Sequence, residues 1–415
     1  MSTKISRRDF IRAGVAVAGT TLYPKLSHVP LFEPKPKIQD YRILGRTGLR
    51  VSDVSLGAGV PQDPALIKYV LDLGVNYIDT AEHYSNGRSE RVIGEAVKGR
   101  RKDVFITTKL AVRDNNTEEQ LIERFFRCLE RLQTDHVDVL MFHNPSSKEI
   151  LTLPFVHKAF QKLKSDGKVR FFGLSCHEPH MVDICNFAIE DGRFDVLLFV
   201  YNFMQEKAAE VLKHAAQKNV GSTIMKVHAS EHPEQIRSVS REEQQKFQDE
   251  ADRQTLRFRE KYDLKKDEYF RAAISWVLQN AAVGCVVTSI RTFDQANDYV
   301  SVSGKKFTKR YKETLDDYSQ RLFDRYCRHA CGECEPYCPH GVAVNDVLRL
   351  DTYFTNYRQE EKAITEYAEL EEARKPTSCL NCPGICEPHC PYGLPVRERL
   401  LITHNHLSKK RTVFV

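Results

Sequence analysis

Short runs of hydrophobic, often β-branched residues alternate with longer amphipathic stretches over most of the chain. Eight such runs follow a proline-rich segment at 30–36, and each has the length of a buried strand: 54–58, 77–81, 104–110, 137–143, 170–176, 196–202, 222–227 and 285–290. Between them, apolar residues recur at helical spacing, as in 65–73, 89–97 and 118–132. Strands that alternate with helices predict a parallel sheet.

Eight strand–helix units is the number that closes a parallel sheet into a (β/α)8 TIM barrel. We therefore expect an α/β barrel over residues 42–309, joined to the N-terminal region by a linker at 31–41. A strongly charged segment at 231–266 precedes the last predicted barrel helix, at 268–279. It is expected to form a charged surface helix, with a lid at the barrel mouth as the alternative.

The pattern changes from about Arg310 onwards. Eight of the 12 cysteines fall between Cys327 and Cys390, and the segments around them predict helices at 344–357 and 364–373 but no strand. We expect a small, mostly α-helical C-terminal domain over residues 310–405. So short a segment has little apolar core of its own, which favours stabilisation by bound metal.

The N-terminus carries two adjacent arginines before a short apolar run. The string Ser6-Arg7-Arg8-Asp9-Phe10-Ile11 and the run from Ala13 to Leu22 resemble a twin-arginine export signal, which we place at residues 1–30. The resemblance implies a periplasmic protein, or one held on the outer side of the inner membrane. A flexible basic tail is the alternative. Apart from an uncleaved signal, no stretch is long and apolar enough to predict a transmembrane helix.

The charge of the chain is nearly balanced. Lysine and arginine number 62 against 56 aspartates and glutamates, giving a net charge of +6 that is spread along the sequence. A nucleic-acid partner is therefore not expected, because such proteins usually concentrate positive charge. A small-molecule substrate is the better hypothesis.

Ionisable residues stand at the ends of three consecutive predicted strands. Asp79 and Tyr84 lie in the string Asp-Thr-Ala-Glu-His-Tyr after the second strand, Lys109 ends the third, and His143 ends the fourth. Each residue alone could serve as a helix cap, a packing group or a buried structural side chain. Together they are expected to converge, because barrel active sites form at the C-terminal ends of the strands.

These motifs, with Asn86-Gly-Arg-Ser-Glu90, resemble the aldo-keto reductase superfamily over nearly all of residues 42–303. The resemblance implies that Asp79, Tyr84, Lys109 and His143 form a catalytic tetrad, and that NADP(H) or NAD(H) supplies the hydride. Tyr84 would exchange the proton, Lys109 would lower the pKa of Tyr84, Asp79 would hold Lys109, and His143 would orient the carbonyl. Carried over in the same way, the cofactor-binding positions are Ser175, Asn202, Met225, Lys226, Ser289 and Arg291. Three positions depart from the family pattern: Cys176 and Tyr299 replace asparagines, and Leu198 replaces a glutamine.

The C-terminal cysteines form two similar clusters. The first is Cys327-x3-Cys331-x2-Cys334-x3-Cys338-Pro and the second is Cys379-x2-Cys382-x3-Cys386-x3-Cys390-Pro. They resemble the two-cluster bacterial ferredoxin motif with one extra residue in each copy, which implies one or two [4Fe-4S] clusters and a ferredoxin-like domain. The resemblance further implies that Cys390 joins the first three cysteines and that Cys338 joins the second three. Structural zinc and disulfides are the alternatives.

The sequence thus predicts an oxidoreductase that interconverts a carbonyl (aldehyde, ketone or sugar) and an alcohol by hydride transfer with a nicotinamide cofactor. Electron transfer through iron–sulfur clusters to a redox partner protein could be coupled to it. The alternative is an exported electron-transfer or binding protein with a catalytically weakened barrel, which the departures at Leu198 and Tyr299 favour.

Overall fold

The computed structural model describes residues 35–59, 63–229, 268–355, 357 and 359–408. The chain divides into two compact units, residues 1–35 and 36–415, and every element described below belongs to the second. The predicted export signal and the charged segment at 231–266 lie outside the described residues.

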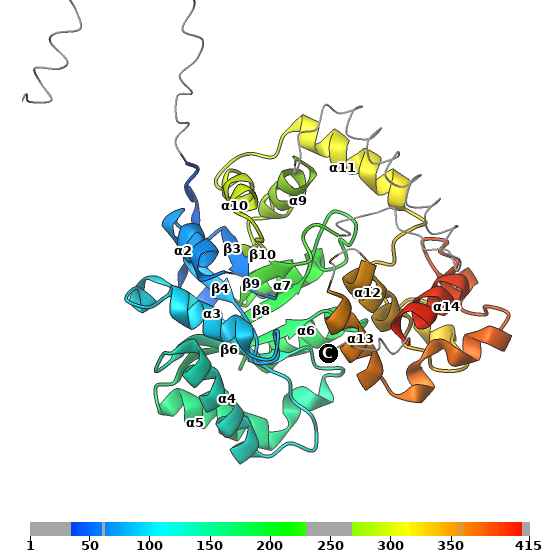
Figure 1. Cartoon of the computed structure of the whole chain (residues 1–415), viewed down its shortest axis with the longest axis horizontal. Coiled ribbons are helices and arrows are strands. Elements are labelled where there is room, and N and C mark those ends of the chain that lie inside the picture. Colours follow the sequence, from blue (N-terminus) through cyan, green and yellow to red (C-terminus); the bar gives the residue numbers. More distant parts are fainter. Residues whose placement is uncertain (1–34, 60–62, 230–267, 356, 358, 409–415) are drawn as a thin grey trace, which may run out of the picture. The chain divides into compact units, whose positions relative to one another are not determined.

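Eight parallel strands form a closed barrel, as the sequence predicted (Figure 1). They follow one another around the barrel in chain order, and β10 closes it by pairing with β3, with Val286 opposite Val54. The strands are β3 (Val54–Gly57), β4 (Tyr77–Asp79), β5 (Phe105–Leu110), β6 (Val137–His143), β7 (Val169–Cys176), β8 (Val196–Val200), β9 (Gly221–Met225) and β10 (Cys285–Thr288).

Helices connect the strands and cover the barrel. They are α2 (Pro64–Asp72), α3 (Arg88–Ala96), α4 (Glu118–Leu132), α5 (Pro154–Ser165), α6 (Met181–Asp191), α7 (Ala209–Gln217), α9 (Glu268–Leu278) and α10 (Phe293–Val300). Local sequence fixes the ends of α4: Thr117 and Gln120 form a reciprocal capping box, and Gln133 ends the helix in a left-handed conformation. Gly94 lets α3 approach α4 closely, because a Cβ there would lie 2.6 Å from the carbonyl oxygen of Leu132.

A short hairpin closes the N-terminal end of the barrel. Strands β1 (Tyr41–Ile43) and β2 (Arg50–Ser52) pair in antiparallel fashion, and the 3₁₀ turn Gly45–Thr47 lies between them. Leu44 is fully buried against Gly221 and Gly284, in the glycine-lined entrance of β9 and β10. The hairpin leaves the opposite end, where the strands finish, as the place for a site.

The described C-terminal part contains helices and 3₁₀ turns but no strand after β10. Helix α11 (Lys309–Leu322) packs on α9 through Leu315, Tyr318 and Leu322. Helices α12 (Val344–Thr355), α13 (Glu360–Glu369) and α14 (Val396–Leu407) enclose a second core, and α12 and α13 are in contact. The 3₁₀ turns are Glu335–Tyr337, Glu372–Arg374, Pro376–Asn381 and Glu387–His389.

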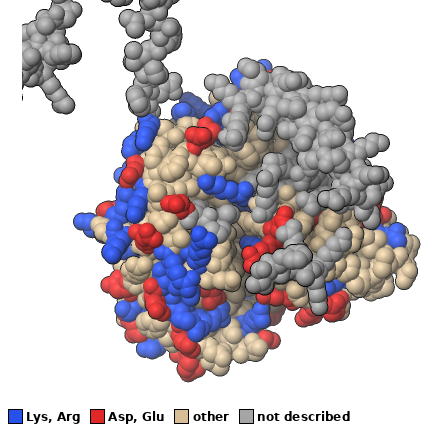
Figure 2. Space-filling model, viewed as in Figure 1, with Lys and Arg blue, Asp and Glu red and all other residues tan. Residues whose placement is uncertain are grey.

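Surface charge is mixed. On the face shown in Figure 2, lysine and arginine side chains lie among aspartates and glutamates. No helix within the described ranges is long and apolar enough to cross a membrane.

Candidate active site

A cavity of about 1230 Å³ lies at the C-terminal ends of the barrel strands. Two parts of the chain line it. The barrel contributes Asp79, His83, Tyr84, His143, His177, Lys226 and Arg291, and helices α12 and α13, with the residues between them, contribute Arg349, Tyr353, Tyr357, Lys362 and Glu366. The volume is large enough for a cofactor together with a small substrate.

A buried ion pair forms the floor of the cavity. The Nζ of Lys109 donates to Oδ1 of Asp79 at 2.5 Å and to the carbonyl oxygen of Thr80 at 2.7 Å. Both charged side chains are almost wholly inaccessible to water. Burial raises the pKa of Asp79 and lowers that of Lys109, but the attraction between the two charges opposes both shifts. The pair is therefore expected to be charged and, as a unit, neutral.

Tyr84 and His143 lie beside this pair. The Nζ of Lys109 is 4.9 Å from the centroid of the Tyr84 ring, and the Tyr84 and His143 rings are 5.7 Å apart in an edge-on arrangement. His83 stacks on His143 with 4.6 Å between ring centroids. The Nδ1 of His143 and Oδ2 of Asp79 are buried with no hydrogen-bond partner. The structure therefore brings together all four residues of the predicted tetrad.

Burial controls the protonation of these groups. It raises the pKa of Tyr84, and the negative charge of Asp79 raises it further, whereas Lys362 lowers it. A second cation, Lys362, thus opposes the rise, while Lys109, the cation that the sequence led us to expect, lies closer to the ring and is paired with Asp79. Burial also lowers the pKa of His143 well below its usual range, so the imidazole is neutral near pH 7.

The predicted cofactor positions divide into two groups. Met225, Lys226, Ser289 and Arg291 line the cavity. Ser175 and Asn202 are buried behind it: the Ser175 hydroxyl has no partner, whereas the Asn202 amide donates to the Lys226 carbonyl at 2.9 Å and accepts from the Met204 N–H at 3.0 Å. Asn202 therefore holds the end of β9, where Lys226 has a φ of 58°. Leu198 presents an apolar side chain to the cavity.

The residues that sequence reasoning missed come mainly from α12 and α13. Arg349, Tyr353 and Tyr357 are spaced four apart, as are Lys362 and Glu366. That spacing places Arg349 with Tyr353 on one face of α12 and Lys362 with Glu366 on one face of α13, which was the available signal, whereas Tyr357 follows the end of α12. Nothing in the sequence indicated that these faces meet the barrel.

The family model for aldo/keto reductases matches residues 61–319, more than half of the chain. The chain belongs to the aldo/keto reductase family. A solved aldo-keto reductase of Bacillus halodurans, in its holo form, shares the fold, with a TM-score of 0.53 and 22% identity over 67% of this chain and 95% of that one.

Curated relatives match parts of this aldo/keto reductase. L-galactose dehydrogenase of Arabidopsis thaliana is 31% identical over 44% of this chain and 63% of its own length. An uncharacterised oxidoreductase of Bacillus subtilis is 31% identical over 34% of this chain and 50% of its own. A putative voltage-gated potassium channel subunit beta of Schizosaccharomyces pombe is 37% identical over 34% of this chain and 46% of its own length. The chain spans about half the length of the curated relatives it matches.

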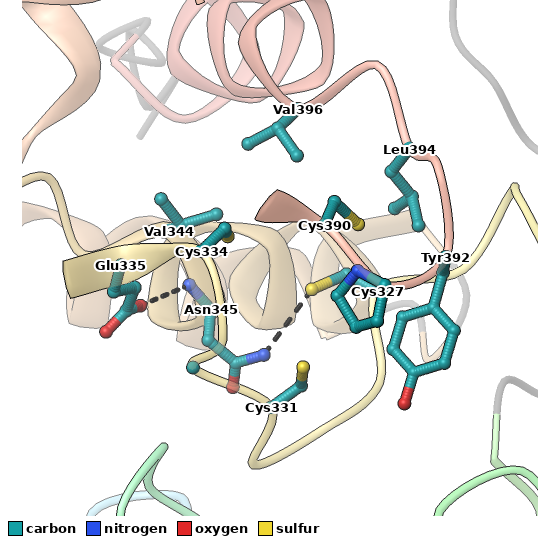
Figure 3. Close-up of a pocket in the computed structure, with 12 residues that line it drawn as sticks. Cys327, Cys331, Cys334, Glu335, Val344, Asn345, Cys390, Tyr392, Leu394 and Val396 are labelled. Atoms are coloured by element: carbon teal, nitrogen blue, oxygen red, sulfur yellow. Dashed lines mark hydrogen bonds between the residues drawn. The ribbon is translucent and has the colours of Figure 1, made fainter. Parts of the chain in front are cut away.

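A second, much smaller cavity lies among the cysteines that follow the aldo/keto reductase barrel (Figure 3). Its volume is about 20 Å³. Three cysteines of the first cluster line it together with one from the second: Cys327, Cys331, Cys334 and Cys390. Asn345 donates its side-chain N–H to the Cys327 sulfur at 3.4 Å.

The other four cysteines, Cys338, Cys379, Cys382 and Cys386, also come from both sequence clusters, and Cys338 of the first lies near Cys379 and Cys386 of the second. Burial and the nearby Cys338 together raise the pKa of Cys379 to about 11. Burial and Cys338 likewise raise the pKa of Cys386. All 12 cysteines are free thiols. In the part of the chain that the structure describes, no three His, Cys, Asp or Glu side chains are arranged to hold a single metal ion.

Proposed function

We propose that this chain is an oxidoreductase that interconverts a carbonyl and an alcohol with a nicotinamide cofactor. The observation that carries the proposal is the buried Lys109–Asp79 pair beside Tyr84, with the unpaired Nδ1 of His143 nearby. Buried polar groups without partners are uncommon and often mark a position where a ligand binds. The substrate is an aldehyde, a ketone or a sugar, because carbonyl and alcohol interconversion is the chemistry expected of the family.

The cavity residues fit a nicotinamide dinucleotide. Met225, Lys226, Ser289 and Arg291 would surround it, and the unpaired Ser175 hydroxyl lies in the barrel wall behind them. Lys226 and Arg291 are cations that suit phosphate groups, with either NADP(H) or NAD(H) as the dinucleotide. When bound, the nicotinamide supplies or accepts the hydride.

The side chains of the barrel handle the proton. In reduction, the Tyr84 O–H bond breaks and its proton passes to the carbonyl oxygen, while the carbonyl carbon receives the hydride. Tyr84 becomes a phenolate, which the neighbouring ammonium groups stabilise. The neutral His143 imidazole donates a hydrogen bond that orients the carbonyl. Oxidation of the alcohol reverses each transfer.

Substitution of the phenol tests this function. Tyr84→Phe should lower kcat for NADPH-dependent reduction of an aldehyde panel by about 100-fold or more, because the phenylalanine ring has no proton to donate to the carbonyl oxygen. Tyr69→Phe is the matched control, since the Tyr69 hydroxyl contacts Asn297 outside the cavity. Unchanged turnover in Tyr84→Phe would rule out the proposed acid.

A binding function without efficient turnover is the second candidate. The apolar Leu198 in the cavity favours it, as do the contacts of Tyr353 and Tyr357 with Lys226 and Arg291, two expected cofactor ligands. The relative described as a potassium channel subunit beta also supports it. If this candidate holds, the wild-type chain binds dinucleotide but turns over no carbonyl.

We further propose that the cysteines hold two [4Fe-4S] clusters in a ferredoxin-like domain. Cys327, Cys331, Cys334 and Cys390 would hold one, and Cys338, Cys379, Cys382 and Cys386 the other. The support is the mixing of the two sequence clusters around one cavity (Figure 3). A four-iron cluster holds its cysteine sulfurs farther apart than a single metal ion does. Cysteines that bind such a cluster therefore need not be arranged around one point. Such clusters can pass single electrons to a redox partner protein.

Analysis of metal content tests the clusters. Protein purified without oxygen should contain about eight iron and eight sulfide per chain. Cys390→Ala should lower both to about half, whereas Cys285→Ala, in the barrel wall, should leave them unchanged. Zinc without iron, or full iron in Cys390→Ala, would contradict the assignment.

A further inference from the structure

Helices α12 and α13 form one wall of the barrel cavity and are attached to the barrel by polar contacts. The Lys226 Nζ donates to the Tyr353 hydroxyl at 2.8 Å, and Arg291 donates to the Tyr357 carbonyl at 3.4 Å. A third contact is the ion pair between Arg349 and Glu178, 3.7 Å apart. Because these contacts join buried or half-buried groups, they fix the position of the wall.

One side chain of this wall reaches the predicted acid. The Nζ of Lys362 on α13 lies 5.5 Å from the centroid of the Tyr84 ring and 4.6 Å from that of Tyr353. Its ion-pair partner is Glu366, at 3.7 Å, but Glu366 is shared with Arg349, which lies 3.9 Å from it. The negative charge of Glu366 is therefore divided between two cations.

The charges around Tyr84 explain why a second cation matters. The barrel groups that face Tyr84 are Asp79 and Lys109 in the floor, His143 on β6 and His83 in the same loop as Tyr84. The C-terminal groups are Arg349 and Tyr353 on α12, and Lys362 and Glu366 on α13. The floor pair is neutral as a unit, and the histidines are uncharged near pH 7 because burial lowers the pKa of both. The Lys109 ammonium is thus balanced by Asp79, and Lys362 adds a further positive charge beside a phenolate at Tyr84.

We propose that Lys362 is a positioning residue of the barrel active site, through which the C-terminal domain stabilises the Tyr84 phenolate. The domain is then part of the catalytic apparatus and not only a carrier of cysteines. This inference rests on the proposed function, in which Tyr84 exchanges the proton. The direction of the effect agrees with the charge of Lys362, which lowers the pKa of Tyr84 against the effect of burial.

A titration that needs no turnover tests the inference. The full chain is prepared with 2,3,5-trifluorotyrosine at position 84, whose phenol ionises several pH units below tyrosine so that the raised pKa falls in a measurable range, and the ionisation is followed by ¹⁹F NMR. Lys362→Met should raise the pKa of this phenol by about 1 to 3 units, as expected when an opposite charge at this range is removed. Lys362→Arg should restore it nearly to the wild-type value.

Lys375→Met is the matched control. Lys375 is also buried in the C-terminal domain, and its Nζ also lies 5.5 Å from a tyrosine centroid, but that ring belongs to Tyr367, outside the cavity. This variant should leave the titration unchanged. Lys362→Gln replaces Lys362→Met if the latter does not fold.

Kinetics separate this inference from the proposed function. If the wild-type protein oxidises alcohols, Lys362→Met should lower kcat for this oxidation about 10- to 100-fold near neutral pH. The rise of activity at alkaline pH should then occur at higher pH than in the wild type. An unmoved titration, or an equal shift in Lys375→Met, overturns the inference even if the enzyme is active. A shifted titration in a chain with no turnover supports the role of Lys362 and contradicts only the proposed function.

Discussion

Tyr84 and Tyr353 are two buried phenols on one cavity, and their surroundings act on them in opposite directions. Burial and Asp79 raise the pKa of Tyr84. Burial would also raise the pKa of Tyr353, but Lys226, Arg349 and Lys362 together lower it to about 8. Tyr353 is therefore the more acidic of the two, and its negative charge at alkaline pH would reduce the effect of Lys362 on Tyr84.

The titration of Tyr353 gives a pH-dependent prediction. Phenolate absorbance should show one step near pH 8, where an ordinary tyrosine remains protonated, because three cations favour the ionised form. The step should disappear in Tyr353→Phe and persist in Tyr84→Phe. Since the pKa is lower in the folded than in the unfolded chain, the stability gained from this ionisation is present above about pH 10 and is lost as the pH falls through about 8.

A spectrum without this step, or a step that persists in Tyr353→Phe, would contradict the assignment. Tyr367→Phe serves as the control, because burial raises the pKa of Tyr367 and keeps it protonated at pH 8.

Single residues differ in how well the sequence predicts their positions. Asp79, Tyr84, Lys109 and His143 could be predicted because each lies near the end of a strand or in the loop that follows one, and barrel geometry brings strand ends together. Lys362 and Tyr353 could not, because their place in the cavity depends on how two distant helices dock on the barrel. No local pattern encodes that docking.

At the scale of elements, hydrophobic periodicity predicted the eight barrel strands to within a few residues of their observed ends. It missed the hairpin of β1 and β2, whose strands have three residues each and are too short for a periodic signal. The helix predicted at 364–373 is observed at Glu360–Glu369. The apolar pattern does not mark its start, because the first turn consists of charged residues, Glu360, Glu361 and Lys362, that line the cavity.

For the cysteine-bearing turns, too, the sequence predicts local features better than contacts between distant segments. Their spacing indicated two groups of four, and the resemblance to ferredoxins implied that each group borrows one member from the other. The structure places Cys390 with Cys327, Cys331 and Cys334, which agrees with that exchange. The identity of the metal does not follow from the positions of the sulfurs and stays a prediction.

At the scale of the molecule, one chain combines an aldo/keto reductase barrel with a helical, cysteine-rich C-terminal part. The two share a cavity in which the barrel supplies Tyr84, His143 and the Lys109–Asp79 pair, and the C-terminal helices supply Lys362 and Tyr353. The proposed clusters lie in this same C-terminal part. Its helices therefore connect the cysteines to the cavity wall, so loss of the clusters would be expected to disturb the wall as well.

The proposed function requires that hydride pass directly from a bound nicotinamide to a carbonyl carbon in this cavity. The most direct test uses NADPH that carries deuterium at the transferable position of the nicotinamide ring, with mass analysis of the alcohol formed by anaerobically purified protein. We expect one deuterium on the carbinol carbon of each product molecule, and almost no product from Tyr84→Phe. An alcohol whose new C–H hydrogen comes from solvent, as electron transfer in single steps would produce, would contradict it.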